Sequence, residues 1–516
     1  TTLEVSAEGG SFGYNRQAVR AGRQRGATAY ELRVARQATD GYRDHSALER
    51  VTAQASLRQR LGERRELELH ALYTDLTYQL PGGLNPEQLA ENPRQARPGS
   101  ARTQAAINYQ NLLLGGTHRT VGRRLVHTVS GYASGFYFDH PFNIDYKRET
   151  NLAAGGRTVL DWQAAPAGRP LLLSVGAEYQ TQFRFGQNFG NETGEPTELN
   201  FSDEIGSSQY LVFGQAVQRL GERWRLTAGA SLNRLTYKVD RTFDAAGNTG
   251  RTRSDFRPEV VPRVALAYLP GNATWYASVS RGFSSPTLDE FRTNEGSLNT
   301  DLEAETGTNF ELGYRAAHGD GRLQTELIGY YFRLEQSISS FADSAGRQLF
   351  RNAGAVDQFG IEATLAYRII ARPTAWLTSL DARAAYTYQN FTYADFVRAG
   401  TEVSGNRLPG SPPHTATLTL DAATRPGWYA RAYWNYTDAI PLNDEGSVRA
   451  KAFHLVRFRL GREFMFGRRR LDVYAGVNNL LDERMSFGND LNPQFGRRYF
   501  QPAPGRNYVV GMRLAL

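Results

Sequence analysis

The chain has 516 residues, with 51 glycines, 27 tyrosines, 27 phenylalanines, 6 tryptophans and no cysteine. The absence of cysteine excludes a disulfide framework, a thiolate zinc site, an iron–sulfur cluster and a cysteine nucleophile. The net charge of +8 is a mild excess, and the arginines are spread from Arg16 to Arg513. This spread argues against the basic stripe of a nucleic-acid-binding protein, so we expect no nucleic-acid partner.

Period-two alternation of apolar and polar residues recurs along the chain and predicts β-strands. In residues 51–58 (VTAQASLR) the odd positions are apolar and the even positions are mostly polar. Residues 309–315 (NFELGYR) and 415–420 (TATLTL) repeat the pattern, and residues 508–516 (YVVGMRLAL) are apolar at every even position. No run of about 18 or more apolar residues occurs, so the sequence predicts no transmembrane helix.

Short connections that contain Gly or Pro alternate with longer ones and divide these runs into hairpins. Ten short turns are RQRG (23–26), LGER (61–64), VGRR (121–124), AGRP (167–170), LGER (220–223), LPGN (269–272), HGDG (318–321), ARPT (371–374), TRPG (424–427) and FGRR (466–469). The intervening connections are mostly longer polar stretches, such as 81–102, 188–208 and 241–256. Ten short turns and eleven outer connections join 22 strands, with both termini on the short-turn side.

An even number of alternating strands, with short turns on one side and long loops on the other, is typical of an outer-membrane β-barrel. Lipid cannot satisfy free backbone N–H and C=O groups, so a spanning sheet must close on itself. No composition break divides the chain, and we expect residues 1–516 to form a single all-β domain, a 22-stranded antiparallel transmembrane β-barrel. The alternative is a soluble β-propeller-like scaffold, because two strand intervals have about the length of a propeller blade.

Two further sets of residues fit the barrel. Ionisable residues on the polar strand faces would line the inner wall, where they meet water or another protein segment: Glu31, Arg33, Glu66, Glu68, Glu311, Arg315, Glu326 and Arg513. Tryptophans that open strands directly after a short turn would form an interfacial aromatic girdle: Trp224, Trp275, Trp376 and Trp428.

Several segments resemble the successive strand motifs of TonB-dependent outer-membrane receptors. They are SRGFSSPTLDEF (280–291), LEAETGTNFELGYR (302–315), NAGAVDQFGIEATLAYR (352–368), LPGSPPHTATLTL (408–420), VYAGVNNLLDERM (473–485) and GRNYVVGMRLAL (505–516). The opening, GGSFGYNR (9–16) followed by DGYRDHS (40–46), is similar to the start of that family's barrel. Within the family, residues 81–99 look most like the ferric dicitrate and siderophore receptors.

The resemblance implies a receptor in the outer membrane of a Gram-negative bacterium that crosses the membrane many times. Its implied partners are outer-membrane lipid and lipopolysaccharide, a ferric chelate, a plug domain, the TonB–ExbB–ExbD complex and the barrel assembly machinery. The plug and its TonB box have no counterpart in this chain, so we expect them on a longer precursor or another chain. The family usually ends in an aromatic residue, whereas this chain ends in Leu516. Alternative cargoes are cobalamin, a glycan or another metal chelate.

No catalytic constellation stands out in the sequence. The eight histidines are scattered, and none forms an HxxxH or HExxH pair suited to zinc. We therefore expect no enzyme activity, no cofactor and no resident metal.

Arginines in the predicted outer loops are the candidate ligand-binding residues, because ferric siderophore and citrate complexes are often anionic and Arg presents planar donors to such oxygens. They are Arg94, Arg97, Arg251, Arg253, Arg292, Arg347, Arg351, Arg497 and Arg498. The alternative is that these side chains contact lipopolysaccharide phosphates or only solvate the loops.

Overall fold

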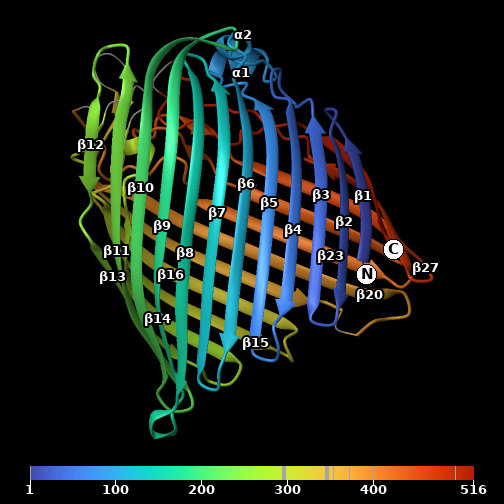
Figure 1. Cartoon of the computed structure of the whole chain (residues 1–516). Helices are drawn as coiled ribbons and strands as arrows, with labels where there is room; N and C mark the ends of the chain where they lie inside the picture. Colours follow the sequence, from blue (N-terminus) through green and yellow to red (C-terminus); the bar gives the residue numbers. More distant parts are fainter. Residues whose placement is uncertain are drawn as a thin grey trace.

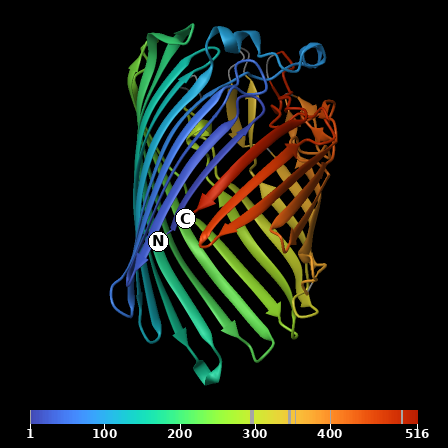
Figure 2. The same cartoon turned by 90° about the vertical axis from the view of Figure 1, so that its right-hand side faces the viewer.

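The computed structural model describes residues 2–292, 298–342, 348–352, 354–370, 372–398, 400–493 and 496–516. Within these ranges, 23 antiparallel strands form one sheet, and its first strand, β1, pairs with its last, β29 (Figures 1 and 2). The sheet is therefore a closed barrel. β12 and β13 pair with successive parts of β11, so the strands occupy 22 positions in the wall. The predicted 22-stranded antiparallel barrel is confirmed.

Among the described residues, the wall consists of consecutive strands that pair without a crossover, except that β13 pairs with β11 rather than with β12. Its first strands are β1 (Thr2–Gly10), β2 (Asn15–Arg25), β3 (Thr28–Thr39), β4 (Leu48–Arg60), β5 (Arg65–Gln79), β6 (Ala106–Val121), β7 (Leu125–Pro141), β8 (Tyr146–Ala164), β9 (Leu171–Glu192), β10 (Glu195–Arg219), β11 (Trp224–Asp244) and β12 (Gly250–Asp255). The remaining strands are β13 (Glu259–Tyr268), β14 (Ala273–Ser284), β15 (Glu305–His318), β16 (Leu323–Glu335), β19 (Ala355–Arg368), β20 (Leu377–Asp395), β23 (His414–Thr424), β24 (Trp428–Thr437), β27 (Phe453–Phe466), β28 (Arg469–Asn478) and β29 (Asn507–Ala515).

Small elements lie in the connections between wall strands. The helices are α1 (Pro86–Glu91), α2 (Pro98–Arg102), α3 (Leu288–Phe291) and the 3₁₀ turn η1 (Pro166–Gly168). The short hairpins are β17 (Ile338–Ala342) with β18 (Gln348–Asn352), β21 (Val397–Arg398) with β22 (Thr401–Glu402), and β25 (Ile440–Pro441) with β26 (Arg449–Ala450). Among the described residues, no helix is both long and apolar enough to cross a membrane.

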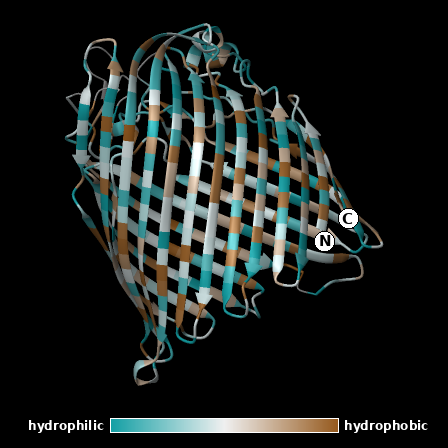
Figure 3. Cartoon of the chain, viewed as in Figure 1, coloured by the Kyte–Doolittle hydropathy of each residue, from teal (hydrophilic) through white to brown (hydrophobic). Residues whose placement is uncertain are grey.

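Alternation along each strand separates an apolar face from a polar one (Figure 3). In β3, the side chains of Tyr30, Leu32 and Val34 are 51%, 49% and 42% exposed, although all three are large and apolar. Between them, Glu31 points to the other face, where Arg20 Nη2 lies 2.6 Å from its Oε2 atom. Such extensive apolar exposure is costly in water, so this face requires an apolar environment.

The apolar face has defined upper and lower limits on β11. Every second residue from Trp224 to Leu232 is apolar, and the next residue on that face is Arg234. Eight steps of about 3.3 Å along a strand tilted by about 40° rise roughly 20 Å, which approaches the height of the apolar band of a transmembrane barrel. The lower limit carries the predicted girdle: Trp224, Trp275, Trp376 and Trp428 are 41–61% exposed at the beginnings of their strands.

The polar face is tied together by ion pairs between neighbouring strands. Arg58 contacts both Glu66 and Glu68 on β5, and Arg315 Nε lies 2.6 Å from Glu326 Oε1. Tyrosines extend this pattern: Tyr276 lies over Gly313 on the adjacent strand, and its hydroxyl donates to Glu311 at 2.6 Å. An added Cβ at residue 313 would lie 2.1 Å from the Tyr276 ring, so this wall position requires glycine.

The ten predicted short turns all lie between consecutive wall strands, which confirms them, although Ala371 in the turn at 371–374 lies outside the described residues. Two predicted loops are wrong. Residues 188–208 belong mostly to β9 and β10, which pair up to a turn at Thr193 and Gly194, and residues 241–256 consist mostly of the ends of β11 and β12. Both hairpins reach the upper end of the barrel (Figure 1). Beyond the apolar band, the strands carry polar residues on both faces and lose the alternation that marks a half-buried strand.

Residues 81–102, one of the longer polar connections, contain α1 and α2 at the top of the barrel (Figure 1). Asn85 caps α1 by accepting from Gln88 N, while the Gln88 side chain accepts from Asn85 N, and Pro86 stands at the first helical position. This capping box favours a helix even in a polar segment.

Candidate functional site

The connections at the long-loop end of the barrel bring distant parts of the chain together. The segment 80–105, between β5 and β6, pairs with the segment 479–506, between β28 and β29, through two backbone hydrogen bonds of Leu84 with Phe500 (2.9 and 3.0 Å). Arg498 Nη1 donates to Gln88 Oε1 on α1 at 2.6 Å. Two of the predicted arginines, Arg97 and Arg498, therefore share one neighbourhood.

Arg43 joins a third connection, 40–47, to this neighbourhood. Arg43 is 6% exposed, and its guanidinium donates twice to Gln95 O and once to Gln501 Oε1 at 2.8 Å. Gln501 Nε2 in turn donates to Asp490 Oδ2 at 3.3 Å. We call Arg43, Arg97, Asp490 and Arg498 the mouth cluster.

The electrostatics of the mouth cluster are strained. Burial lowers the pKa of the Arg43 guanidinium to about 10, and burial together with repulsion from Arg498 lowers the pKa of Arg97. Burial also raises the pKa of the Asp490 carboxyl. In the described part of the chain, no side-chain hydrogen bond or ion pair holds the Arg97 guanidinium. Asp490 attracts both Arg43 and Arg97, and Asp44 also attracts Arg43, whereas Arg498 repels Arg97. With three guanidinium groups and one carboxylate, the mouth cluster has an excess of positive charge.

Two glycines allow the chain to pass through the mouth cluster. Gly82 has a φ of +72°, which favours glycine. A Cβ at residue 83 would lie 2.3 Å from Asp490 Oδ2 and 2.4 Å from Arg498 O. The PGG sequence before α1 is thus required for the packing of segment 80–105 on segment 479–506.

The other predicted arginines lie in different surroundings. Arg94 donates to Tyr42 O at 3.0 Å with its guanidinium 5.5 Å from the Tyr42 ring centre, at the edge of the mouth cluster. Arg497 is exposed beside Arg498, and Arg351 donates to Val397 O at 3.1 Å. Arg347 lies outside the described residues.

Arg251 and Arg253 lie on β12 rather than over the lumen. Arg251 Nε is 2.6 Å from Asp240 Oδ2, and Arg253 Nε is 2.6 Å from Asp255 Oδ2. On β11, Lys238 pairs with Arg253 and Asp240 pairs with Arg251. These positions lie on the same side of the sheet as the apolar face. These arginines are therefore paired above the apolar band.

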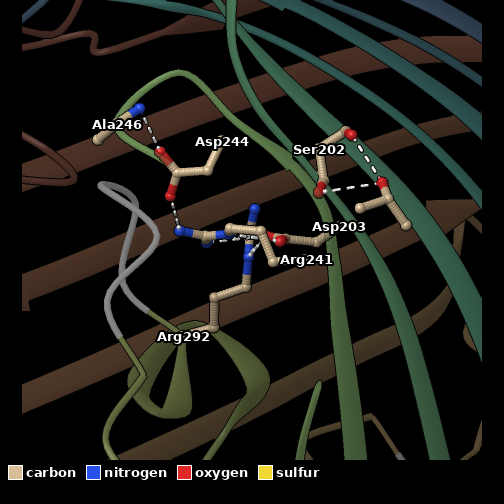
Figure 4. A network of polar contacts seen from close by, with 7 residues as sticks. Ser202, Asp203, Arg241, Asp244, Ala246 and Arg292 are labelled. Carbon is tan, nitrogen blue, oxygen red and sulfur yellow. Dashed lines mark hydrogen bonds and ion pairs between the residues drawn. The ribbon is translucent and has the colours of Figure 1, made fainter. Parts of the chain in front are cut away.

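Arg292 belongs to a buried network centred on Asp203, whose side chain is 0% exposed (Figure 4). Arg292 Nε and Arg241 Nε donate to different carboxylate oxygens of Asp203, the latter at 2.8 Å, and Arg241 also pairs with Asp244 at 3.1 Å. Both guanidinium groups lie over the ring of Phe201, 4.6 and 5.1 Å from its centre. This network fixes the segment that follows β14 to the polar face of β10 and β11.

A cavity of about 520 Å³ lies beneath the anchored segment. Residues 285–288, which we call its cover, line the cavity together with residues of β7, β8, β9, β10, β11 and β14. Tyr237 spans wall and cover, because its hydroxyl donates to Pro286 O at 3.0 Å while its ring packs 5.4 Å from that of Phe291. We call this the wall cavity.

Sequence reasoning missed Arg43, Asp490 and Asp203. The motif DGYRDHS contains Arg43, but nothing local distinguishes its guanidinium from an ordinary loop arginine. In the described residues, no group of three or more His, Asp or Glu side chains is arranged to hold a metal ion.

Residues 5–480 match the sequence pattern of the TonB-dependent receptor-like β-barrel family. The chain belongs to that family. Its members are outer-membrane receptors and transporters rather than enzymes.

Solved structures share the fold at low sequence identity. The ferric citrate transporter FecA in its unliganded form aligns with a TM-score of 0.85 and 15% identity, covering 100% of this chain and 78% of FecA. The siderophore receptor PiuA from Acinetobacter baumannii aligns at 0.80 and 15%, covering 100% and 81%. The copper transporter OprC aligns at 0.75 and 17%, covering 100% and 80%. These alignments establish the fold of the receptor barrel, while the cargoes in the names belong to those proteins.

Proposed function

We propose that this chain is the barrel of an outer-membrane receptor for TonB-dependent uptake of a ferric chelate, either a siderophore complex or ferric citrate. Residues 1–516 form a single multi-pass transmembrane domain in a Gram-negative bacterium. The plug domain and TonB box lie outside these residues, and the TonB–ExbB–ExbD complex supplies the energy. Family membership supports the transport class, and the names of FecA and PiuA support iron chelates as cargo.

The mouth cluster is the observation that carries the cargo proposal. No hydrogen bond or ion pair among the described residues holds the Arg97 guanidinium, and burial together with repulsion from Arg498 lowers its pKa. A carboxylate or catecholate chelate would relieve this repulsion, and each guanidinium presents parallel donors that fit two such oxygens. The mouth cluster therefore favours capture of an anionic chelate.

The experiment is a titration of purified chain 1–516 in detergent micelles with ferric dicitrate, ferrichrome, cyanocobalamin and maltotriose. We expect binding of a ferric chelate, and we expect the double variant Arg97→Gln, Arg498→Gln to bind ferric dicitrate at least about tenfold more weakly. The matched control is Arg251→Gln, Arg253→Gln, which removes the same charge from β12 and should change affinity less than about twofold. Binding of cobalamin or maltotriose without any ferric chelate would contradict the iron cargo.

A second candidate cargo is a chelate of a metal other than iron, which the similarity to the copper transporter OprC favours. Competition decides between the two. Gallium complexes of the same chelators should displace the iron complexes if the ligand oxygens are recognised, whereas displacement by a copper complex alone would favour the second candidate.

A further inference from the structure

The wall cavity shares no residue with the mouth cluster, and its lining has a different chemistry. Apart from tyrosines, Arg184 on β9 is the one ionisable side chain that lines the cavity. Its Nη1 lies 3.5 Å from Glu149 Oε2 on β8, and both side chains are 17% exposed. The positive charge is therefore balanced inside the wall, and the cavity presents no net charge to a ligand.

Neutral polar groups converge on the same space. Gln182 of β9 and Gln209 and Ser207 of β10 lie on the polar strand faces and line the cavity. Among the described residues, none of these three side chains has a hydrogen-bond partner. If a ligand displaces water from these amides without replacing its hydrogen bonds, binding loses free energy. A ligand at this site must therefore supply hydrogen-bond partners.

The side-chain types determine which partners fit. An amide offers a carbonyl acceptor and two N–H donors, and a serine hydroxyl both donates and accepts. The oxygens of an iron-bound carboxylate or catecholate only accept, so they would leave the two Gln carbonyl groups without donors. A ligand that carries its own hydroxyl or amide N–H groups satisfies both halves of each amide.

The cavity is also preorganised. Its cover is fixed by the buried Arg292–Asp203–Arg241 network (Figure 4). The hydrogen bond from the Tyr237 hydroxyl to Pro286 O holds it as well. Ile205 below the cover is 2% exposed and packs with Tyr237 and Phe291 in one apolar cluster. A cover held in place before binding reduces the ordering cost of association, and about 500 Å³ is within the range of small-molecule sites.

We propose that the wall cavity binds the uncharged, hydroxyl- and amide-bearing part of the cargo, with Gln182, Gln209 and Ser207 as its hydrogen-bonding residues. The preferred cargo is then a chelate with a neutral peptide-like or sugar-like backbone, and ferric dicitrate, which lacks such a backbone, engages the mouth cluster alone. This inference rests on the proposed function for the presence of iron in the cargo. The mouth cluster selects for negative charge, and the wall cavity selects for the backbone.

The test uses the full chain 1–516 and the double variant Gln182→Leu, Gln209→Leu, which keeps side-chain size but removes both amides. The probes are ferrichrome, a neutral hydroxamate complex on a cyclic peptide, ferric dicitrate and maltotriose. We expect the variant to bind ferrichrome at least about tenfold more weakly and to bind ferric dicitrate with unchanged affinity. The unchanged probe shows that the variant is folded, and Gln54→Leu on the polar face of β4 is the matched control.

The outcomes separate this inference from the proposed function. One outcome is that ferric dicitrate binding depends on Arg97 and Arg498 while ferrichrome binds the glutamine variant as tightly as the parent. That result overturns the inference and leaves the proposed function standing. If no ferric chelate binds but maltotriose binds in a glutamine-dependent manner, the cavity chemistry stands and the iron cargo fails. If no probe depends on the glutamines, the wall cavity is not the site that we propose.

Discussion

The mouth cluster and the wall cavity differ in charge balance, although both belong to the same barrel. The mouth cluster contains three guanidinium groups and one carboxylate, and no hydrogen bond or ion pair among the described residues holds the Arg97 guanidinium. In the wall cavity, Arg184 is balanced by Glu149, and nearby Arg241 and Arg292 converge on Asp203. The difference shows that the number of arginines does not mark a binding site. What matters is which cations the fold leaves without an acid.

The two regions also differ in how they are held. The mouth cluster depends on backbone pairing between segments at opposite ends of the chain, through Leu84 and Phe500. The wall cavity depends on a buried side-chain network within the outer half of β10, β11 and the segment after β14. Changes that break one region should therefore leave the other intact, and the expected effects below follow from this separation.

The largest effect is expected for Asp203→Ala. The substitution leaves two guanidinium groups buried without their shared carboxylate, which typically costs about 3–5 kcal/mol. The segment 285–292 should detach, so limited proteolysis should cleave there, and ferrichrome affinity should fall. The control Asp255→Ala removes a carboxylate from an exposed pair and should leave the cleavage pattern unchanged. Equal protease resistance of Asp203→Ala and the parent would show that the network does not hold the cover.

A smaller effect is expected for Gly83→Ala, which acts on the mouth cluster alone. Its Cβ would lie 2.4 Å from the backbone oxygen of Arg498, so the two segments must move apart at a cost of about 1–3 kcal/mol. Ferric dicitrate affinity should fall about tenfold, while glutamine-dependent ferrichrome binding should persist. Gly250→Ala is the control, since no atom lies within 4 Å of its added Cβ. If Gly83→Ala weakens the binding of both ferric dicitrate and ferrichrome, the mouth cluster and the wall cavity are coupled.

Salt should separate the regions without any substitution. Between about 50 and 500 mM NaCl, the affinity for ferric dicitrate should fall about tenfold, because solvent-accessible charges in the mouth cluster are screened. The affinity for ferrichrome should change less than about twofold, because neutral hydrogen bonds carry it. Calorimetric titration at each salt concentration measures both. A steep salt dependence for ferrichrome would place that ligand in the mouth cluster instead.

The smallest effect is a pH dependence set by Asp490. Burial raises the pKa of its carboxyl above the ordinary value of 3.8, so the folded protein takes up this proton at a higher pH than an exposed aspartate does. As the pH falls through that raised pKa, the mouth cluster loses its one negative charge, and anion affinity should rise about threefold. In Asp490→Asn the affinity should already be high and should not show this step. A step that persists in the variant would come from the chelate's own protonation.

Much of the wall was predictable because its signals are local. Each short turn carries a Gly or Pro within four residues, and the alternation in 51–58 or 508–516 needs no information from elsewhere. The hairpin of β9 and β10 was missed beyond residue 188 because both faces become polar above the apolar band. There, pairing with a neighbour holds the strand, and sequence periodicity does not reveal it.

The candidate site was less predictable because long-range pairing decides it. Arg292 resembles any loop arginine until Asp203, 89 residues earlier, neutralises it. Arg498 becomes part of the mouth cluster through Gln88, 410 residues away. Residue type and loop position make Arg292 and Arg498 equal candidates for ligand binding. The folded barrel gives the two arginines different surroundings.

The most direct measurement of the central claim is the position of iron in a crystal of chain 1–516 grown with ferric dicitrate, located by its anomalous scattering. The account predicts an iron peak inside the long-loop end of the barrel, with citrate oxygens in contact with the guanidinium groups of Arg97 and Arg498. An iron site on the outward face beside Arg251 and Arg253, or no ordered iron at a saturating chelate concentration, would contradict it.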